Sequence, residues 1–204
     1  MKKFLAGALI ITSMLGVNVC SADDTFQTVY NENSFSSDMK DNDLRSETFT
    51  TPYGEMKFQM RKLWNSKTDN KMHVLVYLKD KKIYENYLPQ VDYGYTFKAI
   101  KNSADNRQFF VLQSIERALL MGYSPENDKM EIYVDSMNYY HNFEAYPYIG
   151  TLKNGDLVLA FEQINIGKNI PARQRYRFIW NKKSNWFAYV DLGFVNNSVA
   201  VDME

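Results

Sequence analysis

From Pro52 onward, apolar and aromatic residues recur at every second position in short runs separated by polar turns. A period of two places alternate side chains on opposite faces of an extended chain, whereas a helix needs a spacing of three to four. Tyr, Phe and Trp make up 15 % of the chain, and aromatic residues favour strands. The pattern predicts an all-β fold of about ten short strands in antiparallel sheets, forming a sandwich, a barrel or a propeller-like stack.

The individual strands follow from the same period. We expect strands at residues 55–64, 82–87, 95–101, 107–113, 148–152, 157–163 and 174–180. Asn154 and Gly155 are typical of a tight hairpin turn, so 149–152 should pair with 157–161. One stretch is ambiguous, because Leu112, Ile115 and Leu119 also fit one face of a short helix. Alignment with the other strands favours a strand there.

A hairpin-like unit recurs three times, at residues 63–78, 121–136 and 178–193. Each copy runs from aromatic residues through a polar turn into an alternating strand, and the period of about 57 residues between successive copies would suit a unit of about four strands. Chance matches between short aromatic strands are the alternative explanation. On the closing strands, nine residues are predicted to face the core: Met72, Val74, Val76, Met130, Ile132, Val134, Trp186, Ala188 and Val190.

The first 22 residues have the pattern of a secretory signal peptide. Lys2 and Lys3 precede a short apolar run, and Cys20-Ser21-Ala22 offers small residues at a cleavage site. The predicted mature chain begins at Asp23 and is directed to the periplasm or the outside of a bacterial cell. An uncleaved anchor, or a lipoprotein acylated at Cys20, is the alternative. No second apolar stretch approaches the length needed to span a membrane.

Residues 23–51 are polar and acidic, with few apolar side chains, and we predict a flexible arm there that carries a short docking strand near 25–30. Residues 52–204 are predicted to form a single antiparallel β domain. Removal of the leader leaves 22 basic residues against 24 acidic ones, which provides no general attraction to nucleic acid. It also removes the one cysteine, so the mature domain has no disulfide and depends on packing.

The sequence carries no recognisable catalytic or cofactor motif. It lacks a dinucleotide fingerprint, a phosphate loop, a serine nucleophile elbow and the paired histidines of a zinc site, so we expect no cofactor, no metal and no catalytic set. Paired carboxylates for glycoside hydrolysis stay open because such partners meet only in the fold. The acids available for this role are Asp135, Glu144, Asp156 and Glu162.

Two features suit binding. Arg173, Arg175 and Arg177 alternate with aromatic residues, so in a strand their guanidinium groups would line one face and could recognise phosphate, carboxylate or an acidic glycan. The alternative is a solvated outer face over a buried aromatic one. An aromatic loop holds Tyr139, Tyr140 and Tyr146, which could stack on sugar rings or contact a protein. The alternative there is that these rings close one end of the core.

Three functions remain after these exclusions. The first is an exported, non-catalytic binding module whose partner is an envelope protein, a glycan or a lipid. The second is a carrier of a lipid or another small apolar ligand, which requires a continuous interior cavity. The third is a glycan-directed hydrolase, which requires two carboxylates in one cleft. The absence of an assembled catalytic motif favours the first.

Overall fold

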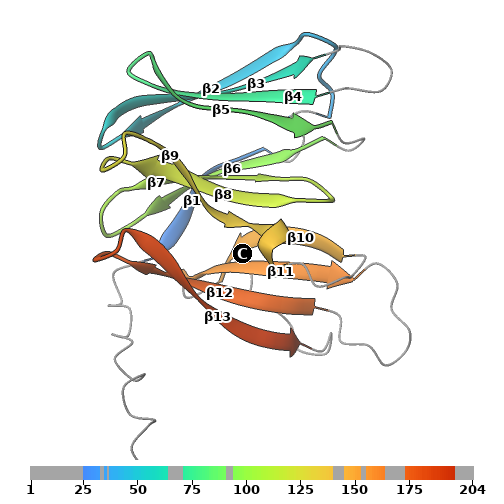
Figure 1. Ribbon diagram of the computed structural model, residues 1–204, viewed down its shortest axis with the longest axis vertical. Helices are drawn as coiled ribbons and strands as arrows, with labels where there is room; N and C mark the ends of the chain where they lie inside the picture. The colour runs from blue at the N-terminus through green and yellow to red at the C-terminus, as the bar shows by residue number, and fades with distance from the viewer. Residues whose placement is uncertain are drawn as a thin grey trace, which may run out of the picture.

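The computed structural model describes residues 25–32, 35, 37–63, 71–90, 94–139, 145–152, 155–163 and 173–195. These residues form thirteen strands and one short 3-10 turn (Figure 1). The strands are β1 (Phe26–Glu32), β2 (Leu44–Thr51), β3 (Gly54–Leu63), β4 (Lys71–Leu78), β5 (Lys81–Pro89), β6 (Thr96–Asn102), β7 (Gln108–Gln113), β8 (Ala118–Ser124), β9 (Lys129–Asp135), β10 (Ala145–Thr151), β11 (Leu157–Gln163), β12 (Arg173–Asn181) and β13 (Trp186–Val195). The all-β prediction is confirmed.

The strands form three antiparallel sheets, each built from four consecutive strands. Sheet B contains β2 to β5, sheet A contains β6 to β9, and sheet C contains β10 to β13. Strand β1 is added to sheet A beside β6, so that sheet has five strands. Each group of four is a meander in which neighbours in sequence pair in space. This local connectivity is why a period-two reading of the sequence finds most of the strands.

The three sheets are stacked, with sheet A between the other two (Figure 1). Two hydrophobic cores fill the stack. The A/B core includes Phe58, Met60, Val74, Val76, Phe97, Phe110, Leu112 and Met121, and the A/C core includes Phe26, Phe109, Leu120, Val134, Leu159, Tyr176, Phe178, Trp180 and Phe187. Sheet A contributes to both cores. Strand β8 is accordingly buried along its whole length, which explains its continuous apolar sequence ALLMGYS.

The described part of residues 23–51 is built into the fold and is not a flexible arm, whereas the docking strand predicted near residues 25–30 is present as β1. Strand β1 pairs with β6 and places Phe26 in the A/C core, while β2 pairs with β3. Between these strands, Phe35 and Met39 are buried in the A/B core. The segment has few apolar residues, but it is fastened because each of these side chains enters a core made by distant strands.

The three predicted hairpin copies do not hold equivalent places. The second and third copies are the β8–β9 and β12–β13 hairpins, each the last hairpin of its sheet. The first copy covers the end of β3 and all of β4, one strand earlier in sheet B, and its turn at residues 64–70 lies outside the described residues. The structure does contain three groups of four consecutive strands. The short hairpin pattern, however, places the first copy one strand too early in its group.

The core prediction holds for β4 and largely for β9, but it fails for β13. Met72, Val74, Val76, Met130 and Val134 are buried, and Ile132 is half-buried against the A/B core. Trp186, Ala188 and Val190 are exposed, and Phe187 takes the inward position instead. Both faces of sheet A are covered by other sheets, so residues at either set of alternate positions in its strands can be buried. Only one face of sheet C meets sheet A, so the parity of its edge strand decides which residues reach the core.

Two local expectations are confirmed. Strands β10 and β11 form the predicted hairpin, with Ile149 opposite Leu159, and Gly155 in its turn has φ of 85°. A Cβ on Gly155 would lie 2.6 Å from Thr25, so the turn is also where the start of β1 passes close to sheet C. The ambiguous stretch around Ile115 is two strands joined by a turn, not a helix. No helix in the described part of the chain has the length and apolar character required to cross a bilayer.

Candidate binding pocket

Two equivalent hairpin turns face each other at one end of the junction between sheets A and C. The β8–β9 turn ends at Asp128 and the β12–β13 turn ends at Asn185, and both residues have φ of 50°. Asn and Asp tolerate this left-handed conformation better than most residues, which explains their place before β9 and β13. A pocket of about 130 Å³ lies between the two turns.

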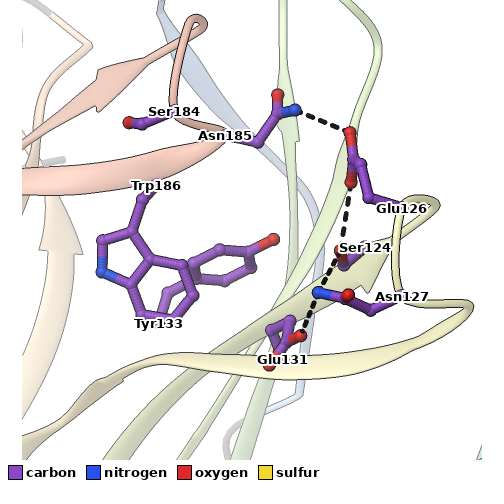
Figure 2. Close-up of a pocket in the computed structure, with 8 residues that line it drawn as sticks. All are labelled: Ser124, Glu126, Asn127, Glu131, Tyr133, Ser184, Asn185 and Trp186. Carbon is purple, nitrogen blue, oxygen red and sulfur yellow. Dashed lines mark hydrogen bonds between the residues drawn. The ribbon is translucent and has the colours of Figure 1, made fainter.

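Eight residues line this pocket, and six of them are polar. The lining residues are Ser124, Glu126, Asn127, Glu131, Tyr133, Ser184, Asn185 and Trp186 (Figure 2). The first five come from the β8–β9 hairpin of sheet A and the last three from the β12–β13 hairpin of sheet C. The site therefore depends on the two sheets being packed together.

A chain of hydrogen bonds runs along the polar wall. The Asn185 Nδ2 donates to Glu126 Oε1 at 2.6 Å and the Ser124 hydroxyl donates to Glu126 Oε2 at 3.0 Å. Asn127 Nδ2 donates to Ser124 Oγ at 3.3 Å and to Glu131 Oε1 at 2.9 Å. The bond between Asn185 and Glu126 joins the two sheets across the pocket, so the network fixes the spacing of its walls.

The opposite wall is aromatic. The rings of Trp186 and Tyr133 lie 4.8 Å apart between centroids, and Figure 2 shows them together on the side away from Glu126. Trp186 is 44 % exposed, whereas Tyr133 is only 6 % exposed. The Tyr133 hydroxyl has no hydrogen-bond partner and points toward the side of the pocket where Ser124 and Glu126 lie.

A buried cation supports the pocket from behind. Arg107 is 6 % exposed, its guanidinium lies 4.9 Å from the Trp180 ring, and its Nη2 donates to Asn185 Oδ1 at 3.3 Å. Asp105 Oδ2 is 3.9 Å from its Nε. The Nε and Nη1 atoms, like the Trp180 indole nitrogen, have no hydrogen-bond partner. Arg107 thus orients Asn185 and holds positive charge beside the pocket.

The pKa shifts describe how the two walls ionise. A hydrogen bond from its own backbone N–H, helped by Ser124, lowers the pKa of Glu126, so this carboxyl is an anion at neutral pH. Burial raises the pKa of Tyr133, an effect that the charge of Arg107 partly opposes, so the phenol is neutral. An ionised acceptor on one wall and a neutral ring on the other favour binding over proton donation.

The arginine stripe differs from its expected form. Tyr176 and Phe178 do face the core, as the alternation predicts, but Arg175 is only 8 % exposed. Arg177 is half-exposed and its Nη1 lies 3.7 Å from Asp156 Oδ2. The side chain of Arg173 lies outside the described part of the chain. The two described guanidinium groups therefore do not form an open basic surface.

The aromatic loop is described only in part. Tyr139 packs against Tyr176, Phe178 and Tyr189 at centroid distances of 5.1, 5.6 and 5.3 Å, and burial raises its pKa. Tyr146 on β10 is 40 % exposed, and Tyr140 lies outside the described residues. Tyr139 thus contacts the inner face of sheet C, the face opposite the arginines, whereas the register of Tyr146 with Glu162 and of Glu162 with Arg173 places Tyr146 on the same face of the sheet as the arginines.

Of the four carboxylates available for hydrolysis, the two whose side chains are described each lie beside an arginine. Asp135 forms a bidentate ion pair with Arg117 and accepts a bond from the Met137 N–H, while Asp156 lies near Arg177 of sheet C. Glu144 and the side chain of Glu162 lie outside the described residues. Among the described residues, no group of three or more His, Cys, Asp or Glu side chains is placed to hold a metal ion.

Comparison with known protein families, with curated proteins and with solved structures finds no match to this chain.

The pocket residues were missed by sequence reasoning, although both turns lie within the hairpin copies that the sequence revealed. The segments SPEND and NKKSN have the composition of ordinary polar turns, which gives no sign of a binding site. The signal that could have found the pocket is the position of Trp186 directly after the second turn, on the face opposite to Phe187. Which of these two residues faces inward depends on which face of β13 is turned toward sheet A, and the sequence of the strand does not show this.

Proposed function

We propose that this chain is an exported, non-catalytic binding module of the bacterial cell envelope, and that the pocket between sheets A and C is its binding site. The observation that carries this proposal is the make-up of the pocket, which combines an ionised carboxylate, an amide and hydroxyl network and an exposed indole. Convergent polar groups beside an aromatic wall are typical of binding sites. The leader at residues 1–22 supports export.

The size of the pocket limits what it can hold. Sites for drug-sized ligands measure roughly 300–1,000 Å³, whereas this one measures about 130 Å³. It suits one chemical group or side chain of a larger partner. A lipid carrier receives less support, because the described interior between sheets A and B is packed with rings such as Phe58 and Phe97 at 4.3 Å.

A hydrolase also receives less support. Retaining and inverting glycosidases both need a carboxylic acid whose pKa is raised, so that it carries a proton at working pH. The pocket does hold two glutamates, but the pKa of Glu126 is lowered. The network therefore favours a permanent acceptor at that position.

Protein-detected NMR on the chain recovered from the periplasm tests this proposal. The probes are n-butylammonium, n-butanol, a methyl glycoside of N-acetylglucosamine, a muropeptide fragment and short peptides. At least one probe should shift the Trp186 indole resonance and the amide resonances of residues 124–133, and the shift should reach saturation. The spectrum of the probe itself should stay unchanged. Chemical conversion of a probe would indicate an enzyme, and no shift with any of them would remove this pocket as the binding site.

Intact mass spectrometry of the same material tests export. The proposal expects a mass that starts at Asp23. Recovery of the full-length chain from the membrane fraction would support the anchor alternative instead. An added noncovalent mass of several hundred daltons under native conditions would favour the carrier function.

A further inference from the structure

The polar wall of the pocket, around Glu126, offers more hydrogen-bond acceptors than free donors. Both amide hydrogens of Asn127 are used, one toward Ser124 and one toward Glu131, and the Ser124 hydroxyl donates to Glu126. The Glu126 carboxylate accepts bonds from Ser124, from Asn185 and from its own backbone N–H, although a carboxylate has about four acceptor sites. A ligand that fits this wall must therefore bring donors.

The negative charge of the Glu126 carboxylate is also available to a ligand. Glu131 lies 3.3 Å from the Nζ of Lys129, so its charge is offset locally. The hydrogen-bond partners of Glu126, Ser124 and Asn185, are neutral. Arg107, the other cation nearby, lies behind Asn185 and has Asp105 at 3.9 Å. The charge of Arg107 reaches Glu126 and helps to lower the pKa of its carboxyl, but the hydrogen-bond partners of that carboxylate are neutral, and a positive ligand group at the Glu126 end would meet an anion without a direct ion pair among the described residues.

The aromatic wall suits the same ligand. The face of an indole attracts cations more strongly than any other side-chain ring, and Trp186 is 44 % exposed. The Tyr133 hydroxyl is an independent sign of a missing partner, since it is buried, is aimed into the pocket and makes no hydrogen bond of normal geometry, although the Arg107 guanidinium is near enough to oppose the rise of its pKa. Its oxygen can accept a bond from a donor that lies between Trp186 and Glu126.

From these three observations we propose that the pocket binds a primary ammonium group, such as the end of a lysine side chain, between the Trp186 ring and the Glu126 carboxylate. This inference rests on the proposed binding function and names the chemical class of its ligand. An ammonium carries three donors and no acceptor, which matches the surplus of acceptors. Its small head suits a pocket of about 130 Å³.

The decisive experiment compares n-butylammonium with n-butanol, its neutral counterpart, by the shift of the Trp186 indole resonance. Trp180 is 3 % exposed and lies in the core, so its indole resonance is the internal control. We expect saturable millimolar binding of n-butylammonium and about tenfold weaker binding of n-butanol, the effect of one exposed cation–π contact and one exposed ion pair. Equal binding of the two would overturn the ammonium assignment.

Variants locate the interaction. Glu126→Gln should weaken n-butylammonium binding about fivefold, while Glu116→Gln, which changes an exposed glutamate in the β7–β8 turn, should not change it. Trp186→Leu should reduce the preference for n-butylammonium over n-butanol to the part that the Glu126 ion pair supplies, measured on the amide resonances of residues 124–133 because this variant lacks the indole. An unaltered affinity in Glu126→Gln, in a variant whose spectrum is otherwise that of the folded chain, would contradict the assignment.

Two further comparisons are needed. One distinguishes a lysine side chain from a free amine, and the other distinguishes failure of the ammonium inference from failure of the proposed binding function. Tighter binding of the peptide Gly-Lys-Gly than of n-butylammonium would identify a lysine side chain of a protein partner, and equal binding would identify a free amine. A shift of Trp186 by the glycoside alone would overturn the ammonium inference and leave the binding function standing. No shift with any probe would overturn both.

Discussion

The A/B and A/C cores are built from the same kind of strands, but they differ at their ends. In the A/B core, Phe58 lies 4.3 Å from Phe97 and 5.7 Å from Phe110, and the edge near Tyr53 and Tyr123 is also closed by rings, 5.1 Å apart. The A/C core has a similar aromatic centre, but it ends in a buried arginine and an open polar pocket.

The difference shows what each junction is for. Buried polar groups without partners lower stability, and Arg107, Tyr133 and Trp180 each hold such an atom within one end of the A/C core. Packing alone does not explain these groups, because the A/B junction solves the same problem with apolar rings. At the polar end of the A/C junction, three such groups lie beside an open pocket, which makes it a place where stability is given up for another purpose.

The largest expected effect is in the A/B core. Phe58→Ala removes a fully buried ring that contacts Phe35, Phe97 and Phe110, and should lower the free energy of unfolding by about 3–5 kcal/mol. Chemical denaturation measures this loss, and Phe58→Leu should lose less because it keeps more volume. A loss below about 1 kcal/mol for Phe58→Ala would mean that this core is not the main support of the stack.

Adding a methyl group, instead of removing a ring, tests how tightly the A/C core is packed. A Cβ on Gly122 would lie 2.6 Å from Cδ1 of Phe109 and 3.1 Å from the Tyr133 ring, so Gly122→Ala should cost about 1–3 kcal/mol and displace Tyr133. Denaturation and the Trp186 indole resonance report the two effects. Gly193→Ala is the comparison, since it has no atom within 4 Å and tests only a positive φ of 68°. An unchanged spectrum in Gly122→Ala would show that the junction can yield.

Alkaline pH tests how dry the A/B core is. Burial raises the pKa of Tyr95 to about 12, and its hydroxyl donates to the Pro89 carbonyl at 2.6 Å. The unfolded tyrosine ionises near pH 10, so this contribution to stability is complete below pH 10 and is lost as the pH rises through 12. At pH 11 the loss amounts to about 1.4 kcal/mol.

The measurement is urea unfolding at pH 8 and pH 11. Tyr95→Phe should lose less stability between these values than the unmodified chain, because the variant has no hydroxyl to ionise at this position. Tyr87→Phe, at a side chain that is 51 % exposed on β5, serves as the control. Identical pH dependence in the Tyr95 variant would show that solvent reaches this hydroxyl in the folded state.

Features that depend on neighbouring residues could be predicted from the sequence. The all-β class, most strands and the β10–β11 hairpin follow from period two and turn chemistry, which act within a few residues. Features that depend on which sheet covers which face could not. The exposure of Trp186 and the burial of Phe187 follow from which face of β13 is turned toward sheet A, and that fact is absent from the β13 sequence itself.

The same reason explains the arm and the pocket. Phe35 and Met39 stand alone in a polar stretch, so composition predicts disorder there, yet each enters a core formed by strands far along the chain. The pocket joins Glu126 to Asn185, which are 59 residues apart. The sequence reveals both turns, but only the packing of sheet A on sheet C brings them together.

The smallest expected effect separates the two cores most sharply. Arg107→Met keeps much of the volume of the side chain and removes two donors that have no partner, at the expense of the contact with the Trp180 ring and the bond to Asn185. Replacing a buried charge with an apolar residue is often neutral or stabilising, so the free energy of unfolding should change by less than about 1 kcal/mol. Binding at the pocket should nevertheless weaken, because Asn185 loses the donor that orients it.

Denaturation and the n-butylammonium titration on the same variant measure the two quantities independently. A loss of more than about 3 kcal/mol would make Arg107 a structural residue and would remove the contrast between the junctions, whereas unchanged stability with weakened binding would show that the polar end of the A/C core serves the pocket.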